Sequence, residues 1–395
     1  MKRAAAAAFA LLGVLVSCAD NSAAPASSKS ASGAVTTASS DPTTTSSPAT
    51  SAITEVASGA TAPEVTAAPA APPTTTWQKV TTSAECMCAD GSPYSYWIHQ
   101  GASDKVVFFL EGGGACFDAA TCAYDSGIYR SKLGAADDPN GFSSGVFDFG
   151  DARNPLADYS FVFAPYCTGD AHLGDATHQY GPDLTIEHKG SVNASTALRA
   201  LADQFPNTTQ LVVTGESAGS IPTPVYAGMA HDLLPNAAIT VLADGSGAYP
   251  DIPALNAAVG ALWGTEAAIP PWPENAGMTA ADWSFPDLFV QAAKHDPEII
   301  FGRHDYAFDV VQQSFLGGVG VPAADLVTLI DANETQIELG GVDLRSYIAP
   351  GASHTVLSRV SFYAETVEGV PLVDWVTDLI RRKPDPDVHC AICTP

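Results

Sequence analysis

The chain has 395 residues, of which 46% are hydrophobic and 15% charged, so it can bury a large core and is not disordered throughout. Its 17 basic and 43 acidic residues give a formal charge of −26, which repels phosphate backbones and argues against nucleic acid as a partner. Only the N-terminus is apolar enough to enter a bilayer, which excludes a protein with several membrane spans.

Residues 1–18 have the pattern of a bacterial lipoprotein signal peptide. Lys2 and Arg3 precede a short apolar run, and small residues lead to Cys18, where cleavage would leave a lipidated N-terminus. An ordinary secretory signal is the alternative. Either interpretation places the mature chain outside the cytoplasm, where disulfides persist. The lipoprotein interpretation predicts that a lipid anchor is the only attachment of the protein to an inner or outer bacterial membrane.

Residues 19–76 are almost entirely Ala, Ser, Thr and Pro with scattered acidic residues. Without large apolar side chains at a regular spacing, such a segment cannot offset the entropy lost on ordering. We therefore expect a disordered linker, or alternatively a glycosylated stalk, followed by a folded catalytic domain at residues 77–395.

Strand and helix signals alternate along this domain. Short apolar runs predict strands, and longer segments with helical spacing predict helices at residues 191–205 and 370–382. The strands are expected at residues 105–110, 161–164, 211–214, 239–242 and 299–301. This alternation predicts an α/β fold, with a mostly parallel sheet flanked by helices.

The pattern breaks between residues 251 and 297, where Trp263, Trp272 and Trp283 stand among several prolines. Such a stretch cannot form one regular element. Two interpretations remain open. The tryptophans either form one wall of a binding cleft or fill the core behind an irregular insertion.

A candidate nucleophile follows the strand predicted at residues 211–214. Residues 215–219 read Gly-Glu-Ser-Ala-Gly, the G-x-S-x-G pattern of a sharp turn between a strand and a helix. Neighbours without bulk let the backbone fold tightly, so that the Ser217 hydroxyl projects at the carboxyl end of the sheet. The pattern is weak alone, but its position after a strand favours a nucleophilic serine.

Three glycines end the strand predicted at residues 105–110. Glu111 is followed by Gly112, Gly113 and Gly114, whose backbone N–H groups can approach a ligand closely. In an acyl-transfer enzyme they would bind the oxyanion together with the N–H of Ala218. A phosphate cradle is disfavoured, because no Gly-Lys-Ser/Thr follows and the chain is strongly acidic.

Five motifs occur in an order that resembles the pectin acetylesterase and Notum family of serine carboxylesterases. They are Cys-Ala-Asp-Gly-Ser-Pro at 88–93, Phe-Leu-Glu-Gly-Gly-Gly-Ala-Cys at 109–116, Pro-Tyr-Cys-Thr-Gly-Asp at 165–170, Gly-Glu-Ser-Ala-Gly at 215–219 and Leu-Ala-Asp-Gly at 242–245. The resemblance implies an α/β-hydrolase fold, Ser217 as nucleophile, and Gly113, Gly114 and Ala218 as oxyanion donors. The animal branch has an aromatic residue where this chain has Gly114, which predicts a more open cleft mouth here.

The catalytic base should be a histidine downstream of Ser217, because this fold orders its triad as Ser, acid, His and the base needs a pKa near neutrality. His304, His354 and His389 are the candidates. We predict His354, which lies in a loop of small residues at 350–355 and precedes a threonine, as the resemblance implies for the catalytic histidine. His389 adjoins two cysteines, which favours a structural role.

The acid should follow the strand predicted at residues 299–301, where both Asp305 and Asp309 occur. Strand length alone favours Asp305. Residues 308–312, Phe-Asp-Val-Val-Gln, resemble the stretch around the family's catalytic aspartate, so we predict Asp309. A helix N-cap is the structural alternative for either residue. Asp244, at the end of the preceding strand, is expected to be structural.

Seven cysteines follow Cys18, so one thiol should be free. The resemblance implies a Cys116–Cys122 disulfide, because that spacing recurs in the family. Further hypotheses pair Cys88 with Cys167, and Cys86 with Cys390 or Cys393. The terminal Cys-x-x-Cys at 390–393 is a single pair without a second one, which favours a structural staple over a redox or zinc site.

Four side chains could gather around a divalent ion: Asp170, His172, Asp175 and His178. Most such clusters in an acidic protein are solvated loop residues, and Asp170 belongs to the motif at 165–170. We therefore expect no metal site and assign Asp170 to shaping the cleft. The predicted reaction needs no cofactor.

The sequence thus predicts a monomeric serine carboxylesterase that hydrolyses acyl esters, foremost acetyl esters on a polysaccharide such as pectin, through an acyl-enzyme. A lipase or polyester depolymerase with the same triad is one alternative. A carbohydrate-binding lipoprotein without catalysis is the other.

Overall fold

The computed structural model describes residues 76–395. The predicted signal peptide, the lipidation site at Cys18 and all of the predicted linker except Thr76 lie outside the described residues. Within the described part, no helix combines the length and the apolar character needed to cross a membrane.

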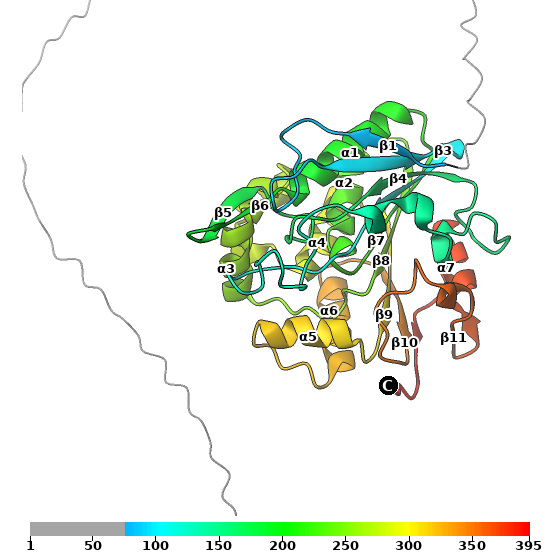
Figure 1. The fold of residues 1–395 in the computed structure, drawn as a ribbon. Coiled ribbons are helices and arrows are strands. Elements are labelled where there is room, and N and C mark those ends of the chain that lie inside the picture. Colours follow the sequence, from blue (N-terminus) through cyan, green and yellow to red (C-terminus); the bar gives the residue numbers. More distant parts are fainter. Residues whose placement is uncertain (1–75) are drawn as a thin grey trace, which may run out of the picture. The chain divides into compact units, whose positions relative to one another are not determined.

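A nine-stranded sheet forms the centre of the fold (Figure 1). Its order from edge to edge is β1-β2-β4-β3-β7-β8-β9-β10-β13, and all neighbours from β4 to β13 run parallel, whereas β1–β2 and β2–β4 are antiparallel. In that order the strands span Gln78–Thr81, Ser95–His99, Tyr159–Ala164, Ala102–Leu110, Gln210–Glu216, Ala238–Asp244, Ile300–Tyr306, Leu344–Ala349 and Val388–His389. The predicted mostly parallel sheet is confirmed.

Within the described residues, two hairpins and seven α-helices accompany this sheet. The hairpins are β5 (Ala176–Gly181) with β6 (Leu184–His188), and β11 (Thr366–Val367) with β12 (Val370–Pro371). The helices are α1 (Gly190–Gln204), α2 (Thr223–Leu233), α3 (Pro253–Trp263), α4 (Phe285–His295), α5 (Val310–Gly318), α6 (Leu326–Leu339) and α7 (Leu372–Ile380).

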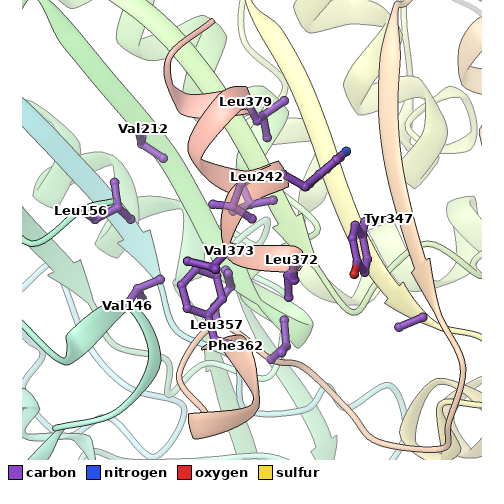
Figure 2. Close-up of a cluster of buried hydrophobic side chains, with 14 of the residues drawn as sticks. Val146, Leu156, Val212, Leu242, Tyr347, Leu357, Phe362, Leu372, Val373 and Leu379 are labelled. Atoms are coloured by element: carbon purple, nitrogen blue, oxygen red, sulfur yellow. The ribbon is translucent and has the colours of Figure 1, made fainter. Parts of the chain in front are cut away.

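The sheet is covered on both faces, as a continuous apolar strand requires. In β3, Val106 and Phe108 belong to a core layer shared with α1, α2 and α4, whereas Val107 and Phe109 point into the layer beneath α7. Figure 2 shows part of the second layer, in which residues of β7, β8, β10 and α7 pack together. Those residues are Val212, Leu242 and Tyr347 from the strands and Leu372, Val373 and Leu379 from the helix.

The parallel strands bring several loops to one edge of the sheet, because their carboxyl ends coincide. β3 leads into the glycines at 112–114, β7 into Ser217, β9 into Asp309 and β10 into His354. Segments separated by more than two hundred residues in the sequence therefore meet at one place. This edge is the α/β-hydrolase-like location for a site.

Candidate active site

Ser217 lies in a strained turn directly after β7. It is one of the few non-glycine residues in a left-handed conformation, with φ of 54°, and it opens a short 3-10 helix over Ser217–Gly219. A Cβ atom on Gly215 would approach the Gly219 carbonyl oxygen to 2.4 Å, and one on Gly219 would approach the Leu110 carbonyl oxygen to 2.1 Å. Both flanking glycines are therefore needed for the turn to pack against the end of β3.

The glycine loop packs against this turn. A Cβ atom on Gly112 would lie 2.7 Å from the Ser217 Cβ, so the absence of a side chain lets the loop approach the hydroxyl-bearing residue. Among the described residues, the backbone N–H groups of Gly113 and Gly114 donate to no backbone acceptor. The Ala218 N–H is in the first turn of its helix, where no acceptor lies within the helix. These three donors are thus available to an oxyanion.

Gly114 adopts a φ of 80°, and a Cβ atom there would approach the Ile128 carbonyl oxygen to 2.0 Å. The space in which a side chain would start is filled by the backbone of residue 128. Where the animal branch has an aromatic side chain, this chain therefore has the backbone of residue 128 close to Gly114, and not only open space.

Asp309 and His354 are brought together. His354 Nδ1 lies 2.6 Å from Asp309 Oδ2, and Asp309 is fully buried. The other aspartate oxygen, Oδ1, accepts the N–H groups of Val311 and Gln312 and caps α5. An aspartate in this position fixes the imidazole so that Nε2 is the free base nitrogen. His354 Nε2 is buried and has no hydrogen-bond partner among the described residues.

Asp305, the alternative acid, does not contact the imidazole. It lies within β9 rather than after it, and its Oδ1 accepts the Gly247 N–H at 2.8 Å and a Gln312 Nε2 hydrogen at 2.9 Å. Gln312 Nε2 also lies 3.1 Å from Asp309 Oδ2 and so links the two aspartates. Sequence reasoning had assigned no role to this glutamine, although it ends the motif at 308–312.

Ser217 stands between two cavities. The first, of about 130 Å³, is apolar and extends from Ser217 and Ala218 to Trp263, Trp283 and Phe315. The second is open, has a volume of about 820 Å³ and is lined by both Ser217 and His354. No hydrogen bond joins these two side chains in the described residues, although they face the same cleft. Such bonds often form only once substrate is bound.

The tryptophan-rich stretch at 251–297 takes both of the roles left open by the sequence. Trp263 and Trp283 line the apolar cavity, whereas Trp272 stacks on His295 and donates to Asp232 away from it. All three are buried in one cluster with Ala218. The stretch also contains two regular helices, α3 and α4, with 3-10 turns between them.

One buried glutamate, Glu111, and one partly buried glutamate, Glu216, lie beside the nucleophile. Burial raises the pKa of Glu111 to about 7, against the opposing effect of Arg130, whose Nη1 lies 2.5 Å from Glu111 Oε1. Burial, with the neighbouring charge of Asp244, also raises the pKa of Glu216 to about 7. Both residues line the open cleft. Glu216 occupies one of the two variable positions of G-x-S-x-G, so the motif gives no signal for it.

Three of the four side chains considered as a metal cluster have protein partners. Asp170 accepts hydrogen bonds from Thr168, His172 and Gly190, and Asp175 pairs with Lys189. His172 Nε2 donates to the Glu111 carbonyl oxygen at 2.9 Å, and burial lowers the pKa of His172 to about 4, which keeps the ring neutral. His172 therefore supports the segment that leads into the glycine loop.

Three disulfides are present among the described residues. Cys116–Cys122 and Cys88–Cys167 match the predictions. The proposed pairing of Cys86 with Cys390 or Cys393 is wrong, because the last two pair with each other and Cys86 is a buried free thiol. Cys86 precedes β2 at one edge of the sheet, whereas Cys390 follows β13 at the opposite edge.

Comparison with known proteins agrees with the motifs. A profile of the pectinacetylesterase family matches residues 69–259. Pectin acetylesterase 5 of Arabidopsis thaliana is 26% identical over 174 residues, which cover 42% of this chain and 40% of that protein. Human palmitoleoyl-protein carboxylesterase NOTUM is 26% identical over 136 residues, or 33% and 27% of the two chains.

The inactive palmitoleoyl-protein carboxylesterase notum1b of Danio rerio is 28% identical over 120 residues, or 29% of this chain and 82% of that protein. The matched part spans about two fifths of the length of the plant relatives, at 40% and 42%.

Proposed function

Because the chain belongs to the pectin acetylesterase and Notum family of carboxylesterases, we propose that it hydrolyses carboxylic esters with Ser217 as nucleophile. The observation that carries this proposal is the position of Ser217. It stands in a left-handed turn between two cavities, one of which also contains His354 held by Asp309.

In the proposed reaction, the Ser217 oxygen attacks the ester carbonyl carbon while His354 Nε2 takes its proton. The oxyanion accepts hydrogen bonds from the N–H groups of Gly113, Gly114 and Ala218. The alcohol leaves with the proton from His354, and water then hydrolyses the acyl-enzyme with the same base. Asp309 stabilises the imidazolium and does not take its proton.

The two cavities suggest where the alcohol part and the acyl part of a substrate bind. The open cleft of about 820 Å³ suits a large alcohol such as a polysaccharide, so we assign acyl esters of a sugar polymer as the substrate class. The apolar cavity would take the acyl group. At about 130 Å³ it is larger than an acetyl group requires, since about 10–15 Å³ of such space holds one water.

This volume favours a second candidate, an esterase for acyl chains of several carbons, as in a lipase or polyester depolymerase. A series of p-nitrophenyl esters from acetate to octanoate separates the two. A maximum of kcat/KM at acetate supports the acetylesterase, and a maximum at longer chains supports the second candidate.

Hydrolysis of p-nitrophenyl acetate by the wild type and by Ser217→Ala tests the proposal as a whole. We expect a loss of at least about 10³-fold in kcat for the variant, because no other group replaces the nucleophile. If neither protein turns over any ester of the series, the result favours the alternative of a carbohydrate-binding protein without catalysis.

We further propose that the domain at residues 77–395 works outside the cytoplasm as a monomer, tethered by a lipid on Cys18 and the segment 19–76. Three disulfides support an oxidising compartment. Cys18→Ser should move the protein from the membrane fraction to the soluble fraction, and an unchanged distribution would contradict the anchor.

A further inference from the structure

Three consecutive backbone N–H groups fix the loop that follows the proposed base. Within residues 356–358, the first two donate to Asp244 Oδ2 at 2.7 and 2.9 Å, and the third donates to Glu216 Oε1 at 2.7 Å. β7 and β8 pair Glu216 directly with Asp244, so the two carboxyl groups stand on adjacent strands. The loop is therefore tied to the ends of two central strands.

Between these anchors and the imidazole lies a strained residue. Thr355 is buried and has a φ of 60°, a conformation that a β-branched residue adopts only when its surroundings impose it. Gly245, with φ of 82°, makes room for it, because a Cβ atom there would lie 3.0 Å from Thr355 Cγ2 and 3.3 Å from His354 Cε1. The hydrogen bonds made by residues 356–358, which follow directly, hold Thr355 in this conformation.

Asp244 is itself held from behind by a buried histidine. Its Oδ1 lies 2.9 Å from His304 Nδ1, and His304 Nε2 lies 3.0 Å from Glu365 Oε1. Both imidazole nitrogens face carboxylates, so the ring satisfies both when it carries two hydrogens. Burial alone would lower the pKa of His304, but the two carboxylates raise it to about 10. The protonated imidazole of His304 orients the Asp244 carboxylate and offsets the free-energy cost of burying it.

Glu216 connects this loop to the nucleophile, because it immediately precedes Ser217 in the chain. We propose that Asp244 and Glu216 are positioning residues which, by holding the N–H groups of residues 356–358, set His354 relative to Ser217. This inference rests on the proposed function. It gives the Leu-Ala-Asp-Gly motif at 242–245 a role: Asp244 anchors the loop and Gly245 leaves space for the base.

Paired substitutions test the proposal. Asp244→Ala and Glu216→Ala should each lower kcat by about 10²-fold with KM changed less than about threefold, because a displaced base affects the reaction more than binding. Asp244→Asn and Glu216→Gln keep one acceptor oxygen and should recover most of that loss. Asp296→Asn is the matched control, since Asp296 is also buried and paired with a histidine, His231, outside the site. It should leave kcat unchanged.

A second measurement does not depend on turnover. The Nδ1 proton in the 2.6 Å hydrogen bond between His354 and Asp309 should give a low-field proton NMR signal, assigned by its loss in His354→Gln. We expect the signal to broaden or vanish in Asp244→Ala and Glu216→Ala and to persist in Asp296→Asn.

The outcomes separate this inference from the proposed function. If the alanine variants lower only the melting temperature, while kcat and the low-field signal match the wild type, the two carboxylates are merely structural and the inference is wrong. If the wild type shows no Ser217-dependent turnover, the proposed esterase function is wrong. The NMR signal alone then shows whether Asp244 and Glu216 position His354. Should Asp244→Ala not fold, the Glu216 pair gives the same decision.

Discussion

Asp309 has two hydrogen-bonding functions, because one oxygen caps α5 and the other holds His354. Capping a helix with the same side chain fixes the carboxylate in a definite orientation before any substrate arrives. The imidazole is therefore oriented by a group that is itself part of a helix terminus, not by a mobile loop side chain.

We predict that Asp309→Asn lowers kcat by about 10⁴-fold, because an amide next to Nδ1 no longer selects the tautomer with a free Nε2. Asp305→Asn should change kcat less than about tenfold, since Asp305 contacts Gly247 and Gln312 and not the base. Steady-state kinetics on p-nitrophenyl acetate, with circular dichroism to verify folding, measure both. A larger loss at Asp305 than at Asp309 would reverse the assignment.

The choice between these two aspartates shows what the sequence could not supply at this scale. An apolar run of three residues, 299–301, marked only the start of β9, which continues through Arg303, His304 and Asp305 as Ile300–Tyr306. These polar residues are buried because each has a specific partner, and partners distant in the chain leave no local signal. Only the family-like motif at 308–312 pointed to Asp309.

At the scale of elements, the central strands could be predicted because they are buried on both faces and therefore read as continuous apolar runs. β3, β4, β7 and β8 contain the predicted segments and extend beyond them by one to three residues at an end. β5 could not be predicted, because its sequence Ala-Thr-His-Gln-Tyr-Gly lacks any apolar alternation. It is a strand because it pairs with β6.

The C-terminal disulfide allows a test of how one local link contributes to stability and to the site. Cys390–Cys393 closes a short loop after β13, and Gly351, within the loop at 350–355 that contains His354, donates to the Thr394 carbonyl oxygen at 2.7 Å. Replacing both cysteines by serine should lower the melting temperature by roughly 3–6 °C, since a loop this short stabilises by about 2 kcal/mol.

The kcat of this double variant should remain within about threefold of the wild type, because the base loop is held independently at residues 356–358. Differential scanning calorimetry and ester hydrolysis provide the two readouts, and Cys86→Ala, which removes no disulfide, is the control. A large loss of kcat would mean that the terminus supports the base directly.

For the whole molecule, buried carboxyl groups predict how stability varies with pH. The raised pKa values of Glu111 and Glu216, both about 7, mean that these groups bind protons more tightly in the folded than in the unfolded chain. Their contribution to stability is fully present below about pH 4.5 and is lost as the pH rises through about 7.

The melting temperature of Glu216→Gln relative to the wild type should therefore rise between pH 5 and pH 8, because the amide stays neutral throughout. Calorimetry at constant ionic strength measures this difference. The comparison with wild type removes the opposite effect of His172 and His188, whose pKa values are lowered to about 4 and which destabilise the fold as the pH falls below about 6.5. A difference that does not vary with pH would contradict a raised pKa for Glu216.

The global arrangement was predictable only in outline. Alternating signals and the order of motifs indicated a parallel sheet with a serine at its edge, but the two cavities draw their walls from segments between residues 109 and 359. Whether Trp263 faces a cavity or the core depends on how residues 251–297 fold over the sheet. No local pattern encodes that placement.

The location of Ser217 at the boundary of two cavities has a kinetic consequence. The released alcohol and the released acid would occupy separate compartments, so each product could stay bound without obstructing the other. An inhibitor that fills the space beside Trp263 and Trp283 would then leave the large opening accessible. Saccharide fragments and fatty acids should accordingly inhibit together, with a combined effect that equals the product of their separate effects, as ligands that do not exclude one another.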